Sequence, residues 1–180
     1  MKERSFIPIS IAILTVSDTR TLNDDKSGNL LEKKIIESGH LLSDRKIVKD
    51  DVLEIKNQTK IWIKNPQIEV IISTGGTGLT GRDVSPEAFK EIFDKEIEGF
   101  GEIFRYLSYK KIGTSTIQSR AIAGVSKGKY IFVLPGSPSA CKDAWEDILV
   151  YQLDYRHKPC NFVEIMPRLL EKNLGRSGKR

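Results

Sequence analysis

The residues best suited to chemistry lie at positions 74–88, where a glycine-rich segment follows a β-branched apolar run. The segment opens with Thr74, Gly75, Gly76, Thr77 and Gly78. Glycines let the backbone approach a phosphate closely and point several N–H groups at it. Asp83 follows, just before an expected helix with Ser85 as its N-cap and Pro86 in its first turn. A carboxylate beside an anion site indicates a bridging cation, and Mg²⁺ on a nucleotide is the usual one.

Two familiar nucleotide-binding motifs and a plain turn fit this segment less well. It is not a P-loop, because no Gly-Lys-Ser/Thr follows the glycines. Residues 76–81 match G-x-G-x-x-G, but the helix begins beyond the last glycine, and the expected ribose-binding acid would fall near Glu102, within a helical run. A plain turn needs fewer glycines. Asp83 is either a cation ligand or a helix cap, and Arg82 either meets a phosphate or stays in solvent.

Four apolar runs predict buried strands, over residues 8–16, 41–48, 69–74 and 130–134. Helical spacing of apolar residues predicts helices between and after them, over residues 27–38, 52–64, 86–93, 100–107, 117–122 and 140–149. Ile36 is among the side chains expected on buried helix faces, and Phe100, Ile103, Phe104 and Leu107 are expected together on one face of their helix. Alternating strands and helices predict crossover connections and a parallel sheet covered on both faces.

In open parallel sheets, ligands bind outside the carboxyl ends of the strands. These ends meet at one rim, so Asp83, the glycines and Ser137 can converge there with Asp50 or Asp51. The helix from residue 52 needs only one of the two acids as its cap, and the sequence does not decide which. Ser119 and Arg120 interrupt an apolar stretch, so they form a placed polar pair or satisfy a helix end by hydrogen bonds.

Composition narrows the class of protein. The chain has 180 residues, of which 39% are hydrophobic and 29% charged, so we expect one globular domain with its core at about 8–162. No signal-peptide core or membrane-length apolar run is present, which predicts a cytoplasmic location. Cys141 and Cys160 should remain free thiols. A basic tail over about 163–180 lacks interleaved aromatics, so we expect no nucleic-acid partner.

Residues 74–78 followed by 82–88 resemble the signature of the MoaB/MogA family of molybdenum cofactor biosynthesis proteins. Agreement continues at residues 15–18, 25–28, 99–102, 119–120 and 134–137. It extends from about residue 11 to residue 162. Residues 112–120 and 158–162 are closer to the MoaB branch than to MogA. Lys49 is a departure, since many relatives have proline there.

The resemblance implies a three-layer α/β/α fold with a mostly parallel sheet, assembled into trimers or hexamers. It also implies binding of molybdopterin and, in catalytic members, adenylylation of its terminal phosphate with ATP. The family's two acidic positions match Asp50 and Asp83, which would be catalytic and hold Mg²⁺ through the nucleotide. Substrate contacts are expected from Ser17, Ser119, Arg120, Gly136 and Ser137. Other enzymes of the cofactor pathway are possible partners, and a molybdopterin carrier without catalysis is the alternative function.

Overall fold

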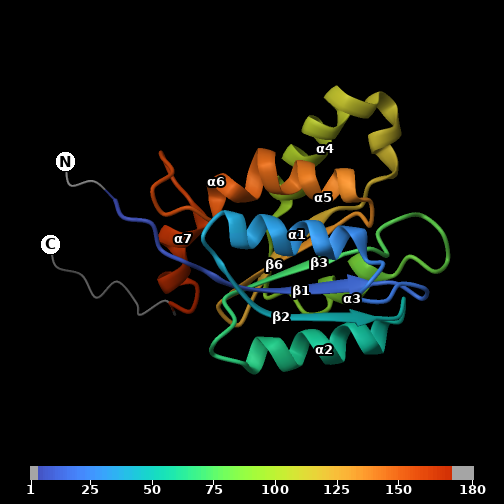
Figure 1. Ribbon diagram of the computed structural model, residues 1–180, viewed down its shortest axis with the longest axis horizontal. Coiled ribbons are helices and arrows are strands. Elements are labelled where there is room, and N and C mark those ends of the chain that lie inside the picture. Colours follow the sequence, from blue (N-terminus) through green and yellow to red (C-terminus); the bar gives the residue numbers. More distant parts are fainter. Residues whose placement is uncertain (1–3, 172–180) are drawn as a thin grey trace, which may run out of the picture.

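A six-stranded sheet forms the centre of the protein (Figure 1), whose computed structural model describes residues 4–171. The strand order is β2-β1-β3-β6-β5-β4. β1 (Ser10–Val16), β2 (Leu41–Val48), β3 (Val70–Thr74) and β6 (Lys129–Leu134) are parallel, as the sequence predicts. β5 (Ile122–Ser126) runs antiparallel to β6 and to the short β4 (Lys95–Glu96). The sheet is therefore mostly parallel, with one reversed strand.

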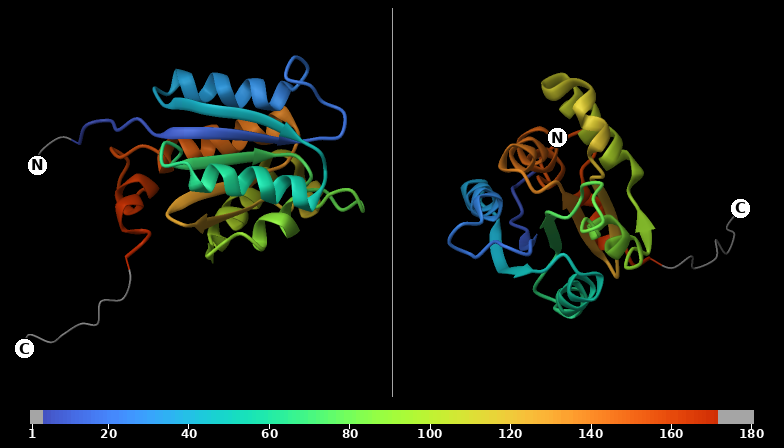
Figure 2. Two further views of the ribbon diagram at one scale, coloured as in Figure 1. Left: turned by 90° about the horizontal axis from the view of Figure 1, so that it is seen from below. Right: turned by 90° about the vertical axis from the view of Figure 1, so that its right-hand side faces the viewer.

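Helices cover both faces of the sheet (Figure 2). One face carries α1 (Lys26–Glu37), α4 (Glu98–Ile112), α5 (Pro138–Ala144) and α6 (Val150–Gln152), the last two joined by a π-helical segment (Trp145–Leu149). The other carries α2 (Val52–Lys64) and α3 (Ser85–Lys90). Successive side chains of a strand point to opposite faces, so Ile13 packs in the first core cluster and Leu14 in the second. This is the three-layer α/β/α fold implied by the resemblance.

The helix predicted over residues 117–122 is wrong. Only its first two residues are helical, as the end of the 3-10 helix η1 (Gly113–Gln118), and its last residue, Ile122, begins β5. Lys127 and Gly128 have positive φ angles of 47° and 82° in the connection between β5 and β6. Two such residues form the tight hairpin turn whose twist matches antiparallel strands. The hairpin therefore draws residues 122–126 into the sheet, where they pair with β6.

The side chain of Ile36, predicted to be buried, is exposed, and so is one member of the apolar face predicted for α4. Ile36 on α1 is 56% exposed and Ile103 on α4 is 42% exposed. On each helix one i, i+4 pair provides the large buried apolar side chains, Leu31 with Ile35 on α1 and Phe100 with Phe104 on α4. The buried stripe of α1 is therefore narrower than predicted.

The chain continues past the predicted core boundary as α7 (Phe162–Ile165) and a 3-10 helix (Met166–Arg168), and Val163 is buried. The rest of the predicted basic tail, 172–180, lies outside the described residues. Cys141 and Cys160 are free thiols, as predicted. Within residues 4–171, no helix is both long and apolar enough to cross a membrane.

Candidate active site

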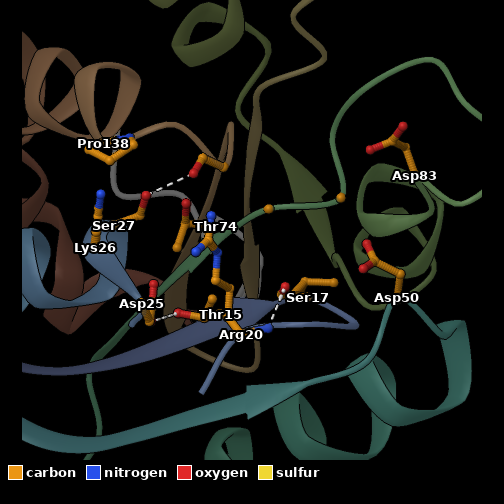
Figure 3. A pocket seen from close by; sticks show the side chains of 14 residues that line it. Thr15, Ser17, Arg20, Asp25, Lys26, Ser27, Asp50, Thr74, Asp83 and Pro138 are labelled. Carbon is orange, nitrogen blue, oxygen red and sulfur yellow. Dashed lines mark hydrogen bonds between the residues drawn. The ribbon is translucent and has the colours of Figure 1, made fainter. Parts of the chain in front are cut away.

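A cavity of about 310 Å³ opens at the carboxyl ends of the parallel strands (Figure 3). This is the rim where the sequence predicts convergence. Segments after β1, β2, β3 and β6 contribute to it. Its lining consists of Thr15, Val16, Ser17, Arg20, Asp25, Lys26, Ser27, Asp50, Thr74, Gly75, Gly76, Asp83, Gly136 and Pro138.

The glycine loop, residues 74–78, passes so close to neighbouring groups that its first two glycines cannot be replaced by residues with side chains. Gly75 and Gly76 have φ angles of 105° and 64°, in the left-handed region that favours glycine. A Cβ on Gly75 would lie 2.2 Å from the Val16 carbonyl oxygen, and one on Gly76 would lie 2.9 Å from Asp50 Oδ1. The backbone of this loop is therefore exposed to the cavity directly beside an acidic side chain.

Backbone groups of the loop differ in their availability. The N–H of Gly75 donates to the Leu134 carbonyl at 3.1 Å, so it is occupied by the fold. The N–H groups of Gly76 and Thr77 have no hydrogen-bond partner among residues 4–171. The Thr74 hydroxyl donates to the Pro135 carbonyl at 2.8 Å. Of these two residues Gly76 lines the cavity and can offer its N–H to an anion, whereas Thr74 ties the loop to the end of β6.

The structure separates the roles of the adjacent acids Asp50 and Asp51. Asp51 Oδ1 accepts the N–H groups of Leu53 and Glu54 at 2.8 and 2.9 Å and caps α2. Asp50 is left to face the cavity. Burial raises the pKa of Asp50 above its ordinary value, and the negative charge of Asp18 raises it further. A half-buried carboxylate whose charged form is disfavoured by its surroundings is typical of a functional site.

Asp83 is held by its own loop. Its Oδ2 accepts the Thr80 N–H at 2.9 Å and the Thr80 hydroxyl at 2.6 Å, and the hydroxyl bond lowers the pKa of Asp83. The prediction that Ser85 caps α3 is wrong, because Ser85 is the first helical residue and its hydroxyl donates to the Gly75 carbonyl at 2.8 Å. Asp83 does not cap α3 either, since no side chain does.

Asp18 links the two segments that carry these acids. Its carboxylate forms an ion pair with Arg82 and accepts the Asp50 N–H at 3.2 Å. Arg82 therefore stays in solvent, as one of the two interpretations has it, and pairs there with a carboxylate from the segment after β1. This role of Asp18 was not predicted, although the residue lies only two positions beyond the end of β1.

The opposite end of the cavity is basic and was also missed. Figure 3 shows Asp25, Lys26 and Ser27 on one side of the glycine loop and the acids Asp50 and Asp83 on the other. Asp25 is buried, caps α1, and accepts bonds from the Thr15 hydroxyl at 2.6 Å and from Arg45 at 2.9 Å.

The carboxylate of Asp25 is thus occupied by partners within the fold. The cations that line the cavity at this end are Lys26 and Arg20. The signal for Lys26 lies in the sequence at 25–28, which the resemblance includes without giving it a role.

The predicted substrate residues divide into two groups. Ser17 and Gly136 line the cavity. Ser137 instead caps α5 by accepting the Ala140 N–H at 3.2 Å. Ser119 and Arg120 lie outside the cavity lining, as do Thr77 and Gly78. The Ser119 hydroxyl is buried without a hydrogen-bond partner among the described residues, and Arg120 contacts the outer side of the glycine loop.

The donor set at the acidic end can be compared with the needs of different metal ions. No group of three or more His, Cys, Asp or Glu side chains among residues 4–171 is arranged to hold a metal ion. Mg²⁺ commonly binds through one or two carboxylates together with substrate phosphates and water. Asp50 and Asp83 beside the glycine loop fit that mode. They do not form a resident metal site of the zinc or calcium type.

Comparison with known proteins agrees with this architecture. Residues 12–155 match the family described as "Probable molybdopterin binding domain". The chain is 52% identical over 157 residues to molybdenum cofactor biosynthesis protein B of Escherichia coli K12, covering 87% of this chain and 92% of that protein. It is 47% identical over 152 residues to the Staphylococcus epidermidis protein of the same name, covering 82% and 86%.

Solved structures show the same fold. A crystal structure of molybdenum cofactor biosynthesis protein B has a TM-score of 0.81 at 40% identity, covering 83% of this chain and 94% of that one. The tungsten cofactor synthesizing protein MoaB from Pyrococcus furiosus has a TM-score of 0.71 at 38% identity, covering 79% and 91%. Since the matches extend over most of its length, the chain belongs to the MoaB/MogA family of molybdenum cofactor biosynthesis proteins.

Proposed function

We propose that this protein transfers the adenylyl group of ATP to the terminal phosphate of molybdopterin. The observation that carries the proposal is the charge pattern of one cavity. The unpartnered N–H group of Gly76 lies between an acidic end and a basic end. Two anionic substrates that must meet, one of them carrying a divalent cation, fit such a cavity.

The acidic end would receive the nucleotide. Asp50 and Asp83 would hold Mg²⁺ against the ATP phosphates, where the ion neutralises charge that develops during transfer. The N–H groups of the loop orient the phosphates, and their backbone positions are fixed by contacts such as Ser85 with Gly75. Orientation by a rigid loop reduces the entropic cost of bringing the reacting groups together.

The basic end would receive the phosphate of molybdopterin. Arg20 and Lys26 line this end, and the carboxylate of Asp25 beside them is already paired with Arg45. A phosphate oxygen of molybdopterin attacks the α-phosphorus of ATP, the bond to the bridging oxygen breaks, and pyrophosphate leaves. The attacking phosphate is already an anion, so no side chain has to remove a proton from it.

A carrier that binds molybdopterin without chemistry is the alternative. It would use the basic end and the glycine loop but would not need an acid near them. Asp50 faces the cavity although burial raises its pKa, so the fold retains a carboxylate where a charge is costly. This observation favours the enzyme.

The two functions are distinguished by incubating the purified protein with molybdopterin, ATP and Mg²⁺. The enzyme releases pyrophosphate in step with formation of adenylyl-molybdopterin, and it releases none when molybdopterin or Mg²⁺ is left out. A carrier binds molybdopterin but leaves ATP intact. Tight molybdopterin binding without ATP consumption would contradict the proposed reaction.

We further propose that the chain acts as one domain in the cytoplasm, alongside other enzymes of the cofactor pathway, and as a trimer or a pair of trimers. Support for assembly comes from the arm formed by α4 and η1, which projects from the body at the top of Figure 1. Apolar side chains remain exposed along it at Ile103, Tyr106, Tyr109, Ile112 and Ile117. Such a patch is typical of a protein interface.

A further inference from the structure

Arg120 lies in the link between η1 and β5, on the side of the glycine loop away from the cavity. Its Nε donates to the Gly78 carbonyl at 2.8 Å and makes a longer bond to the Thr77 carbonyl at 3.4 Å. Its Nη2 donates to the Asp83 carbonyl at 2.8 Å, and its Nη1 pairs with Glu87 on α3. One guanidinium thus joins both ends of the segment 78–83 to the helix that follows it.

The segment has few other attachments to the body of the protein. Leu79 is 67% exposed, and residues 80–82 are also exposed. The bonds between Thr80 and Asp83 close the segment on itself without fixing it to the sheet. The remaining side-chain link is the ion pair of Arg82 with Asp18, which lies in solvent and contributes little. Arg120 is therefore the main half-buried anchor of this segment within residues 4–171.

Gly78 transmits this anchoring to the Asp83 carboxylate. A Cβ on Gly78 would lie 2.7 Å from Asp83 Oδ2, so the Gly78 backbone is in direct contact with the carboxylate. Arg120 holds the carbonyl groups of both residues. A shift of either carbonyl would consequently change where the carboxylate points.

We propose that Arg120 is a positioning residue that fixes the Asp83 carboxylate at the acidic end of the cavity. The inference rests on the proposed function, because it gives the carboxylate a cation to hold. It replaces the expectation that Arg120 contacts substrate, since the guanidinium meets loop carbonyls outside the cavity lining. Groups that orient a metal ligand from outside commonly change metal affinity or activity by ~10- to 100-fold when removed.

The planar guanidinium is essential to this role. Its N–H groups diverge in a fixed fork and so reach two carbonyls and Glu87 together. A lysine keeps the positive charge but offers a single flexible ammonium group. Arg120→Lys should therefore preserve the charge and release the loop. Arg105→Lys is the matched control, because Arg105 is a half-buried arginine that donates to the Ala121 carbonyl at 3.2 Å from α4.

The test uses two readouts on the full-length protein. Hydrogen–deuterium exchange without ligand reports on amides 78–84, and electron paramagnetic resonance measures the affinity for Mn²⁺ in the presence of ATP. We expect Arg120→Lys to speed exchange locally at 78–84 and to weaken Mn²⁺ binding by ~10-fold or more. Arg105→Lys should change neither. If Arg120→Lys does not fold, Glu87→Gln should give the same local changes in smaller measure, because it loosens the guanidinium.

Each outcome decides the inference. Unchanged exchange in folded Arg120→Lys would show that the arginine does not hold the segment. Faster exchange with unchanged Mn²⁺ affinity would show that it orders the loop without positioning Asp83, which also overturns the proposal. Wild-type protein that binds no Mn²⁺ with ATP would contradict the proposed function itself. The exchange data would still report separately on the anchoring.

Discussion

The carboxylates at the acidic end of the cavity are held in opposite ways. Asp83 accepts hydrogen bonds from Thr80, which lower its pKa and favour its charged form. Asp50 is disfavoured as an anion by burial and by the negative charges of Asp18 and Asp83. The fold therefore stabilises the charged form of Asp83 and destabilises the charged form of Asp50. That difference gives a prediction about stability that is independent of any substrate.

Asp50→Asn should raise the melting temperature at pH 7. A carboxyl group with a raised folded-state pKa stabilises the fold most at low pH, and this contribution is lost as the pH rises through that pKa. Asparagine removes the charge and so removes the loss. Asp51→Ala is the control, because it deletes the cap of α2 and should cost about 1 kcal/mol. Calorimetry that found both variants equally destabilised would contradict this account of Asp50.

His40 should make stability depend on pH. Burial lowers the pKa of His40 from 6.5, and the nearby charge of Asp154 opposes that shift only in part. The ring packs between Phe6 and Trp145, and its Nδ1 accepts the Ile9 N–H at 3.1 Å, which requires the neutral form.

Below about pH 6.5 the unfolded chain binds more protons than the folded one, so the free energy of unfolding should fall until the folded-state pKa is passed. Urea denaturation between pH 5 and 8 measures this slope. His40→Gln should flatten it, since the glutamine amide oxygen can accept the Ile9 N–H without titrating. An unchanged slope in His40→Gln would assign the pH dependence to other groups.

At the scale of elements, the glycine loop contains positions of different sensitivity. A side chain at Gly76 would meet the Ser85 hydroxyl at 2.5 Å in a strained backbone, so substitution there would disturb folding as well as binding. Gly78 does not have a positive φ angle, but a Cβ there would displace the Asp83 carboxylate. A Cβ added to Gly81 would have no neighbouring atom within 4 Å. These differences allow a matched pair of single-methyl changes.

Gly78→Ala should lower the adenylylation rate by ~10-fold or more with little change in melting temperature, because it moves an acid that orients the nucleotide. Gly81→Ala should keep the wild-type rate. Steady-state kinetics with ATP as the varied substrate compares the two variants. Equal rates in both would show that the position of Asp83 does not matter.

Strand ends carried most of the predictive information in the sequence. β1, β3 and β6 are continuous apolar runs, which only a sheet covered on both faces can bury, and the rim at their carboxyl ends follows from that topology. Asp50, Asp83 and the glycines were found in this way. β5 was not predicted, since its segment is short, contains Gly124 and adjoins the apolar residues that were assigned to a helix over 117–122. Its place in the sheet depends on the turn at Lys127.

Arg120 shows why the remainder of the site could not be predicted. Its partners are backbone carbonyls some 40 positions away, at Gly78 and Asp83. Every residue has a carbonyl, so no residue type marks them. The basic end of the cavity was missed for a related reason. Lys26 becomes a lining residue only because Asp25 turns inward to Thr15 and caps α1.

At the scale of the whole molecule, the exposed arm of α4 and η1 leads to a prediction about assembly. Ile117 is 81% exposed, and it lies in the same arm as exposed Tyr109 and Ile112. Light scattering at micromolar concentration should therefore find a closed, trimer-based oligomer. Ile117→Asp should shift the population toward smaller species because it places a charge in an apolar interface. A wild-type monomer would contradict the prediction.

The most direct test of the proposed reaction is the rate of adenylyl-molybdopterin formation by Asp83→Asn. Asparagine keeps the size of the side chain and can still accept a bond from Thr80, but it lacks the charge that holds Mg²⁺. The rate should fall at least ~100-fold, which corresponds to a loss of about 3 kcal/mol in transition-state stabilisation. Molybdopterin binding should change little. A folded Asp83→Asn protein that adenylylates molybdopterin at the wild-type rate would contradict the account.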